Sequence, residues 1–271
     1  MTVLVWSLPL WLLATAAATP FVVRWSGRNA GYLLGTAVAG AAVAVAASAP
    51  SILDEAMSVS VPWIPQLGAQ LALRLDALSL LFSLLVLGIG ALVLWYSPGY
   101  LDSGGSHGRY YTGLMAFVAA MTTLVLANDL VLLYVAWEAT TIASVVLIAH
   151  RSEGRGPALK ALVINVAGGF ALLAAALVAL AVVGDVPMHE LGRPDRWPTG
   201  AAPFLGLLLV AAAVKSAQPP FHSWLPDAMV APTPVSAYLH AAAMVKAGVY
   251  LLLRFGELLA SEPFIATATV L

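Results

Sequence analysis

The chain alternates long apolar runs with short polar connections. A helix needs about 20 mainly apolar residues to cross a hydrocarbon layer, because each residue advances it about 1.5 Å through roughly 30 Å. By this measure the sequence predicts about eight spanning helices, at 3–23, 30–49, 76–97, 111–127, 129–150, 158–183, 203–229 and 235–256. A ninth apolar segment starts at Pro263 and stops at Leu271. The predicted fold class is an all-α polytopic integral membrane protein, with about eight helices plus the start of a ninth.

Composition supports a membrane protein and excludes several function classes. The 271 residues are 61% hydrophobic and 9% charged, far from an ordinary soluble domain. A formal net charge of -1 leaves no basic surface for nucleic acid, and the absence of cysteine excludes disulfides and thiolate chemistry from this chain. No G-x-S-x-G, H-E-x-x-H, G-x-G-x-x-G or P-loop motif is present. The sequence therefore gives no signal for an enzyme, and we expect no catalytic residues, cofactor or metal.

Basic residues in the short loops predict the orientation. If the N-terminus lies outside, the first, third and fifth loops are cytoplasmic and carry Arg24, Arg28, Arg109, Arg151, Arg155 and Lys160. The opposite side carries Arg74, Arg193, Arg196 and Arg254. The difference favours a multi-pass protein of the cytoplasmic membrane with its N-terminus outside.

Three charged residues lie deep within apolar helices. Glu138, Lys215 and Lys246 stand about eight, twelve and ten residues inside their segments, or roughly 12 to 18 Å deep. Each charge at the centre of a spanning helix costs about 2.5 to 3.5 kcal/mol. One interpretation is that these charges only form buried ion pairs, which seldom repay their desolvation. The alternative, which we favour, is an ion or proton path.

The neighbours of these charges add further polar groups. Tyr134 and Thr141 share a helical face with Glu138, and we expect that face to point into the bundle. His240 and Lys246 are six residues apart, about 120° around the helix, so they cannot jointly chelate a metal but could serve as successive stations. For His240 a proton relay is favoured over a purely structural hydrogen bond.

Two adjacent prolines interrupt the seventh predicted span. Pro219 and Pro220 lack backbone donors and prevent the helix from continuing, and Lys215 stands one turn before them. Broken membrane helices commonly mark transport sites, although a simple kink with a snorkelling lysine is the alternative. His222 follows the break as a candidate relay group. Haem or metal binding by His222 and His240 has no further support in the sequence.

A long motif around this break resembles a known family. The segment "KSAQPPFHSWLPDAMVAPTPVSAYLHAAAMVKAGVYLLLR" at 215–254 is similar to the antiporter-like proteins shared by Mrp-type multisubunit cation/proton antiporters and respiratory complex I. Features at 74–97, 159–169 and 244–250 favour the large A-type subunit of the Mrp antiporters. The corresponding complex I subunit would be expected to have threonine at Lys246.

The resemblance implies roles for particular residues. It matches Glu138 to a glutamate of the fifth helix, Lys215 to a lysine of a broken seventh helix, and His240 with Lys246 to a pair in the eighth. It also implies three regions: 1–109 as an N-terminal three-helix part, 110–256 as a five-helix half-channel bundle, and 257–271 as the start of a next helix. Pro219 departs from the family's usual aromatic or aliphatic residue. The A-type subunit is normally several times longer, so the chain is expected to be a truncated part.

The resulting hypothesis is a subunit that translocates protons in exchange for Na+ or another monovalent cation. Glu138 and Lys215 would act as an electrostatic switch, with His240 and Lys246 as the onward path. The partners would be other membrane subunits, H+, Na+ as the expected cargo, and the lipid bilayer. One alternative is a proton-pumping subunit of an NADH:quinone oxidoreductase or membrane-bound hydrogenase. A second alternative, of another class, is a structural or assembly scaffold.

Overall fold

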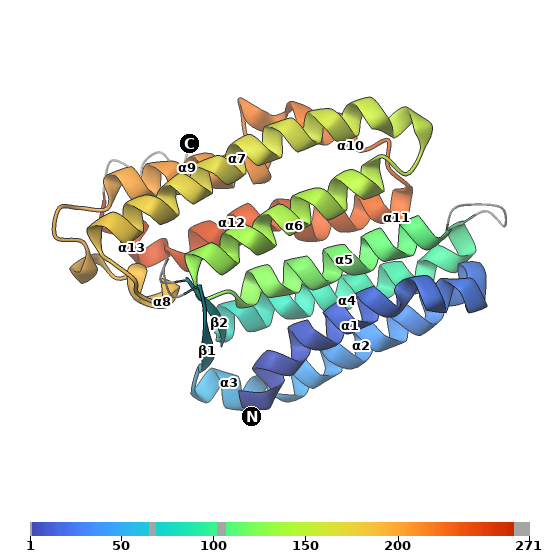
Figure 1. Cartoon of the computed structure of the whole chain (residues 1–271), viewed down its shortest axis with the longest axis horizontal. Coiled ribbons are helices and arrows are strands. Elements are labelled where there is room, and N and C mark those ends of the chain that lie inside the picture. The colour runs from blue at the N-terminus through green and yellow to red at the C-terminus, as the bar shows by residue number, and fades with distance from the viewer. Residues whose placement is uncertain (1, 65–68, 102–106, 263–271) are drawn as a thin grey trace.

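The computed structural model describes residues 2–64, 69–101 and 107–262, and it is built mainly of long helices lying side by side (Figure 1). The long helices are α1 (Thr2–Ser26), α2 (Ala30–Ala47), α4 (Ala77–Tyr100), α5 (His107–Leu126), α6 (Leu130–Ile148) and α7 (Arg155–Val182). Among the described residues, six helical stretches are long and apolar enough to cross a membrane, and the first of them, Val3–Ala47, runs through both α1 and α2. A membrane protein with several spans is therefore confirmed, whereas the count of eight stays a prediction.

The C-terminal part consists of shorter helices. They are α8 (Met188–Leu191), α9 (Ala202–Lys215), α10 (Trp224–Ala228), α11 (Thr233–Ser236), α12 (Met244–Arg254) and α13 (Gly256–Ala260). A π-helical stretch at Ala237–Ala243 joins α11 to α12. Short 3₁₀ turns lie at Gly27–Asn29, Ser152–Gly154, Pro194–Arg196 and Phe221–Ser223. The predicted ninth apolar segment, 263–271, lies outside the described residues.

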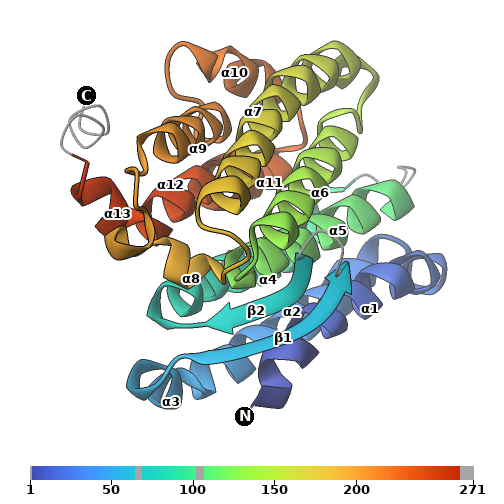
Figure 2. The same ribbon diagram turned by 60° about the vertical axis from the view of Figure 1, so that its left-hand side comes forward.

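A β-hairpin corrects the all-α prediction. Strands β1 (Met57–Ile64) and β2 (Ala69–Leu75) pair antiparallel and lie across one end of the helices, next to the short helix α3 (Ala49–Asp54) (Figure 2). On one face Val59 pairs with Leu73, and Leu73 is buried. The backbone N–H of Asn128 donates to Ala72 O at 2.8 Å, so the hairpin is tied to the connection between α5 and α6.

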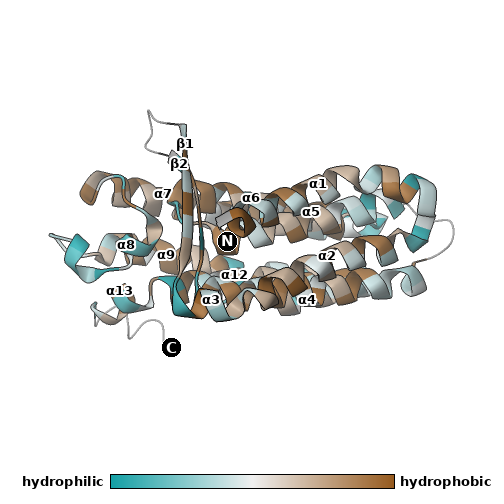
Figure 3. Cartoon of the chain, turned by 90° about the horizontal axis from the view of Figure 1, so that it is seen from below, coloured by the Kyte–Doolittle hydropathy of each residue, from teal (hydrophilic) through white to brown (hydrophobic). Residues whose placement is uncertain are grey.

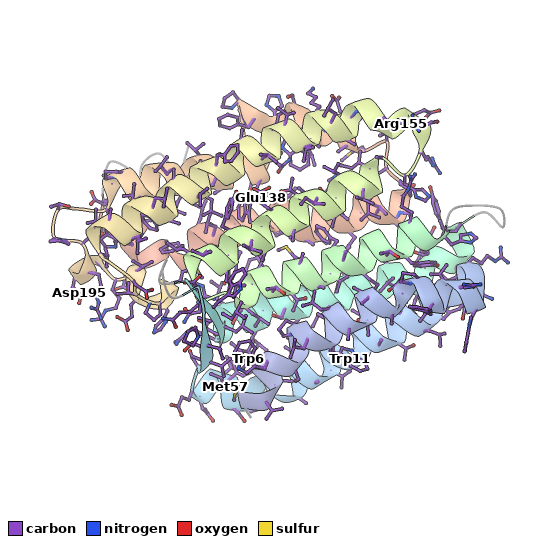
Figure 4. All side chains as sticks on the ribbon, viewed as in Figure 1. Trp6, Trp11, Met57, Glu138, Arg155 and Asp195 are labelled. Carbon is purple, nitrogen blue, oxygen red and sulfur yellow. The ribbon has the colours of Figure 1, made fainter. Side chains whose placement is uncertain are left out.

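Polar residues gather at the two ends of the bundle, and apolar residues cover its length (Figure 3). Arg155 lies at one end, whereas Met57 and Asp195 lie at the other (Figure 4). This is the arrangement expected if successive helices cross a membrane in alternating directions. Which end faces the cytoplasm stays a prediction.

Small residues allow the N-terminal helices to pack closely. A Cβ on Gly31 of α2 would lie only 2.7 Å from Tyr111 Oη of α5 and 2.8 Å from Pro98 Cδ of α4. Close backbone approach of this kind is typical of helix contacts in membranes, where dispersion replaces the hydrophobic effect as the driving force. The N-terminal helices are thus held against α5, the first helix of the proposed half-channel region.

Candidate functional site

The predicted break in the seventh span is present. Helix α9 ends at Lys215, and α10 begins only at Trp224. In a continuous helix the carbonyls of Lys215 and Ser216 would accept hydrogen bonds from residues 219 and 220, but both are prolines and have no N–H. A side chain replaces part of the missing bonding, because Gln218 Nε2 donates to Ser216 O at 3.3 Å. Trp224 Nε1 adds a bond across the break by donating to Val214 O at 3.0 Å.

Lys215 lies at the C-terminal end of α9 and is 0% exposed. Its ammonium donates to Thr141 Oγ1 at 2.8 Å and to Trp137 O at 3.2 Å. The same nitrogen lies 5.0 Å from the centroid of the Trp137 ring, which is within the range of a cation–π interaction. The partial negative charge at the end of a helix also favours a cation there. The structure therefore brings the predicted residues Lys215 and Thr141 into direct contact.

Glu138 is half-buried on α6 and lies between α6 and α7 (Figure 4). Its carboxylate occupies space left by Gly169 of α7: a Cβ on that glycine would overlap Glu138 Oε1. Glu138 and Lys215 are not among the direct ion pairs of the described residues. They are nevertheless neighbours, because Lys215 is bound to Trp137 and Thr141, which flank Glu138 on α6. Tyr134, one turn earlier, is half-buried.

His240 lies in the π-helical stretch and is 5% exposed. Within the described part of the chain, neither ring nitrogen has a hydrogen-bond partner. Its ring meets the edge of Trp224, with centroids 6.0 Å apart, so Trp224 connects His240 to the break through ring packing. Single π turns inside α-helices occur frequently at functional sites.

The remaining predicted residues lie further out. Lys246 of α12 is exposed, and so are Pro219, Pro220 and His222. The structure thus gathers Lys215, Thr141 and Glu138 around one turn of α6, with His240 behind Trp224. It does not bring Lys246 or His222 into contact with them.

Two residues of the site were missed from sequence. Nothing in the sequence distinguishes Gly169 from other helix glycines, because it contributes only the space that a carboxylate from another helix occupies. Asn165 does carry one: it is the single amide side chain in α7, and it is 0% exposed. A polar residue inside so apolar a run is costly and could have been singled out.

A second polar cluster ties the hairpin end together. Asp76 caps α4 by accepting from Ser79 N at 3.0 Å, and Arg254 of α12 donates to it from both terminal nitrogens. Burial opposes ionisation of Asp76, but the hydrogen bond and charge of Arg254 outweigh it and hold the pKa of this carboxyl below its usual value. Arg254 also donates to Tyr250 Oη at 2.9 Å, which in turn donates to Val125 O. The cluster thus connects the start of α4 to α12 and to the end of α5.

Two family models match the sequence. The one described as "NADH:quinone oxidoreductase/Mrp antiporter, TM" matches residues 127–271, more than half of the chain. The one described as "NADH-Ubiquinone oxidoreductase (complex I), chain 5 N-terminus" matches residues 63–111.

Curated relatives and solved structures agree with these matches. The A-type subunit of the Na(+)/H(+) antiporter of Alkalihalophilus pseudofirmus is 44% identical over 210 residues, which are 75% of this chain and 26% of the relative. The putative antiporter subunit mnhA2 of Staphylococcus aureus is 41% identical over 244 residues, 87% of this chain and 30% of the relative. The chain therefore spans less than a third of the length of these relatives.

Among solved structures, the Mrp complex from Dietzia sp. DQ12-45-1b superposes with a TM-score of 0.89 at 45% identity, covering 95% of this chain and 29% of that chain. The membrane-bound sulfane sulfur reductase, an archaeal respiratory membrane complex, superposes with a TM-score of 0.79 at 23% identity, over 93% of this chain and 40% of that chain. The second match shows likeness of fold alone.

Proposed function

The chain belongs to the NADH:quinone oxidoreductase/Mrp antiporter transmembrane family, and from this premise we propose that it forms a proton half-channel in a monovalent cation/proton antiporter of the cytoplasmic membrane. It would act there as a transporter subunit, together with other membrane subunits, in exchange of H+ for Na+. The names of the relatives at 41% and 44% identity support antiport over redox-driven pumping. The half-channel would lie within residues 110–256, with 1–109 packed beside it and 257–271 leading to the next helix.

The observation that carries the proposal is the burial of Lys215 at the end of a broken helix. A fully buried ammonium is expensive unless it is paired or functional, and here its described hydrogen-bond partners are one hydroxyl and one carbonyl, neither of which carries a negative charge. The unwound segment after Lys215 frees backbone groups, which membrane proteins tolerate where the groups face protein or a wet cavity. Broken helices with exposed half-helix ends are typical of ion sites in transporters.

Glu138 is proposed as the switch for this lysine. A carboxylate near a buried amine favours its charged form, whereas burial favours the neutral form. Nζ of Lys215 would hold its proton while Glu138 is ionised and near, and would release it when Glu138 is neutralised or moves. His240 would receive the proton on the far side of Trp224, and Lys246 would pass it to the outer surface of α12.

Charge-removing variants in the complete membrane complex test this proposal. We expect Glu138→Ala and Lys215→Ala each to abolish Na+-dependent proton exchange in inside-out vesicles, with the complex still assembling. Lys160→Ala is the matched control, because Lys160 on α7 forms an exposed ion pair with Asp227 and should be dispensable.

The same variants separate the alternatives. A scaffold without a transport role would tolerate both losses, so normal exchange by Lys215→Ala would contradict the half-channel. Co-purification with hydrophilic iron–sulfur subunits would instead favour a redox-driven pump.

A further inference from the structure

Asn165 is a buried polar residue that the proposed relay does not use. Its side chain is 0% exposed in the middle of α7, and its Nδ2 donates to Ala161 O of the same helix at 2.9 Å. Its Oδ1 is buried and has no hydrogen-bond partner among the described residues. A buried carbonyl oxygen without a donor is unfavourable, and asparagine is also a poor helix former. An apolar residue at 165 would be better for folding alone.

Two close contacts show that the face of α7 that carries Asn165 packs against α6 and the end of α9. A Cβ on Gly168 would lie 2.6 Å from Val214 Cγ1 of α9, and one on Gly169 would overlap the Glu138 carboxylate of α6. The chain reverses direction between α6 and α7 and again between α7 and α9 (Figure 1). Asn165 is one helical turn, about 6 Å, before Gly169. It therefore faces the turn that follows Glu138, which contains Thr141, and the unwound residues that follow Val214.

Several polar atoms of this layer have unused bonding capacity. The Lys215 ammonium has three N–H donors, and its described bonds to Thr141 and Trp137 use two. Glu138 Oε1, like Asn165 Oδ1, is buried without a donor in the described structure. The carbonyl of Lys215 has no helical donor, because residue 219, which would supply it, is a proline without an N–H. The bonding capacity left on these atoms is of the kind that a water molecule, with two to four polar partners, would use.

We propose that Asn165 is a positioning residue that holds water between α6, α7 and the end of α9, next to the Lys215 ammonium. The water accepts the proton that leaves Nζ and passes one proton on, so it remains as water after each transfer. This inference rests on the proposed half-channel for its transport consequence. The presence of water at the site can be tested separately, whether or not the half-channel proposal holds.

Cysteine accessibility tests the wetness directly, because the chain contains no cysteine of its own. Asn165→Cys in the complete complex is exposed to a small methanethiosulfonate reagent, and the mass increase of this chain is followed with time. Leu172→Cys is the matched control, since Leu172 lies two turns further along α7 and is also 0% exposed. A thiol must ionise in order to react, which needs water. We expect the cysteine at 165 to react at least about tenfold faster than that at 172. Equal rates would overturn the inference.

Transport by two further variants tests the role of the oxygen. Asn165→Leu has similar volume but no acceptor, whereas Asn165→Ser keeps a polar oxygen and leaves room for water. We expect the leucine variant to exchange protons about tenfold more slowly, and the serine variant to remain within about threefold of wild type. Equal losses in both variants would indicate a packing role and contradict the proposal. If Lys215→Ala still transports, the half-channel fails; if only the Asn165 variants behave as wild type, this inference fails alone.

Discussion

Replacing Gly169 by alanine tests whether the fit of Glu138 against α7 matters for transport. The added methyl group would overlap Oε1 of Glu138, so the carboxylate must leave its position between α6 and α7. Gly206 of α9 is the matched control, because a Cβ there meets nothing within 4 Å. Both positions are helix interiors, so the intrinsic effect of adding a methyl group is the same.

The two substitutions should change the free energy of unfolding in different directions. Alanine is about 1 kcal/mol better than glycine inside a helix, so Gly206→Ala should stabilise the protein by up to that amount. Overpacking a tight contact costs about 1 to 3 kcal/mol, so Gly169→Ala should be neutral or destabilising by up to about 2 kcal/mol. Two unit charges about 4 Å apart interact by roughly 4 kcal/mol at an effective dielectric constant near 20, which is an upper limit for Glu138 and Lys215 because they form no direct ion pair. Losing a third of that interaction would change the rate about tenfold.

The assay combines thermal unfolding of the purified complex with Na+-dependent proton exchange in vesicles. Gly169→Ala should transport about tenfold more slowly than Gly206→Ala at equal protein content. Identical unfolding temperatures and identical rates for the two variants would refute the assignment of Gly169 as the space for Glu138.

Three further predictions concern other parts of the chain. Because the pKa of Asp76 is lowered in the folded state, its ion pair stabilises the protein fully above the unfolded pKa of about 3.9, and this stabilisation is lost as the pH falls from there through the lower folded pKa. Asp76→Asn should therefore lower the free energy of unfolding by about 2 to 4 kcal/mol at pH 7. Thermal unfolding at several pH values should show the variant and the wild type becoming equally stable in acid. Lys246→Arg should abolish proton exchange without changing stability, since arginine keeps its proton, and normal exchange would exclude Lys246 from the path. Trp224→Phe removes one of two donors to Val214 O, since the N–H of Ala217 also donates there, and should cost about 1 kcal/mol in thermal unfolding; an unchanged unfolding temperature would show that the indole bond is unimportant.

Features that depend on local chemistry could be predicted from the sequence. Runs of about 20 apolar residues located the long helices, and the missing N–H groups of Pro219 and Pro220 located the break. The β-hairpin was not predicted, because its strands of 8 and 7 residues are too short to form an apolar run of spanning length. Its alternation was present, since Val59 and Val61 pair with Leu73 and Leu71 along one face. The π-helical stretch has no comparable signature in the sequence.

The direction of a side chain was harder to predict than its depth. Lys246 has the expected position along its helix, yet it is exposed, whereas Lys215 at similar depth is completely buried. The spacing of His240 and Lys246 already required them to face different neighbours, but apolar residues surround both, so no pattern indicated which would face inward. The contact of Glu138 with Gly169 depends on how α6 and α7 pack, and this packing cannot be predicted from the sequence of either helix alone.

The geometry of the site depends on residues that lack particular atoms as much as on its charged residues. Two prolines without N–H groups end α9 at Lys215, and a glycine without a Cβ admits the Glu138 carboxylate between α6 and α7. Neither feature carries charge, and both act by fixing where a charged group lies. It follows that uncharged substitutions at Gly169 and Pro219 should affect transport more than removal of exposed polar groups such as His222, although histidine is chemically the better proton carrier. The position of the ionisable groups, more than their number, then sets the sensitivity of this region to mutation.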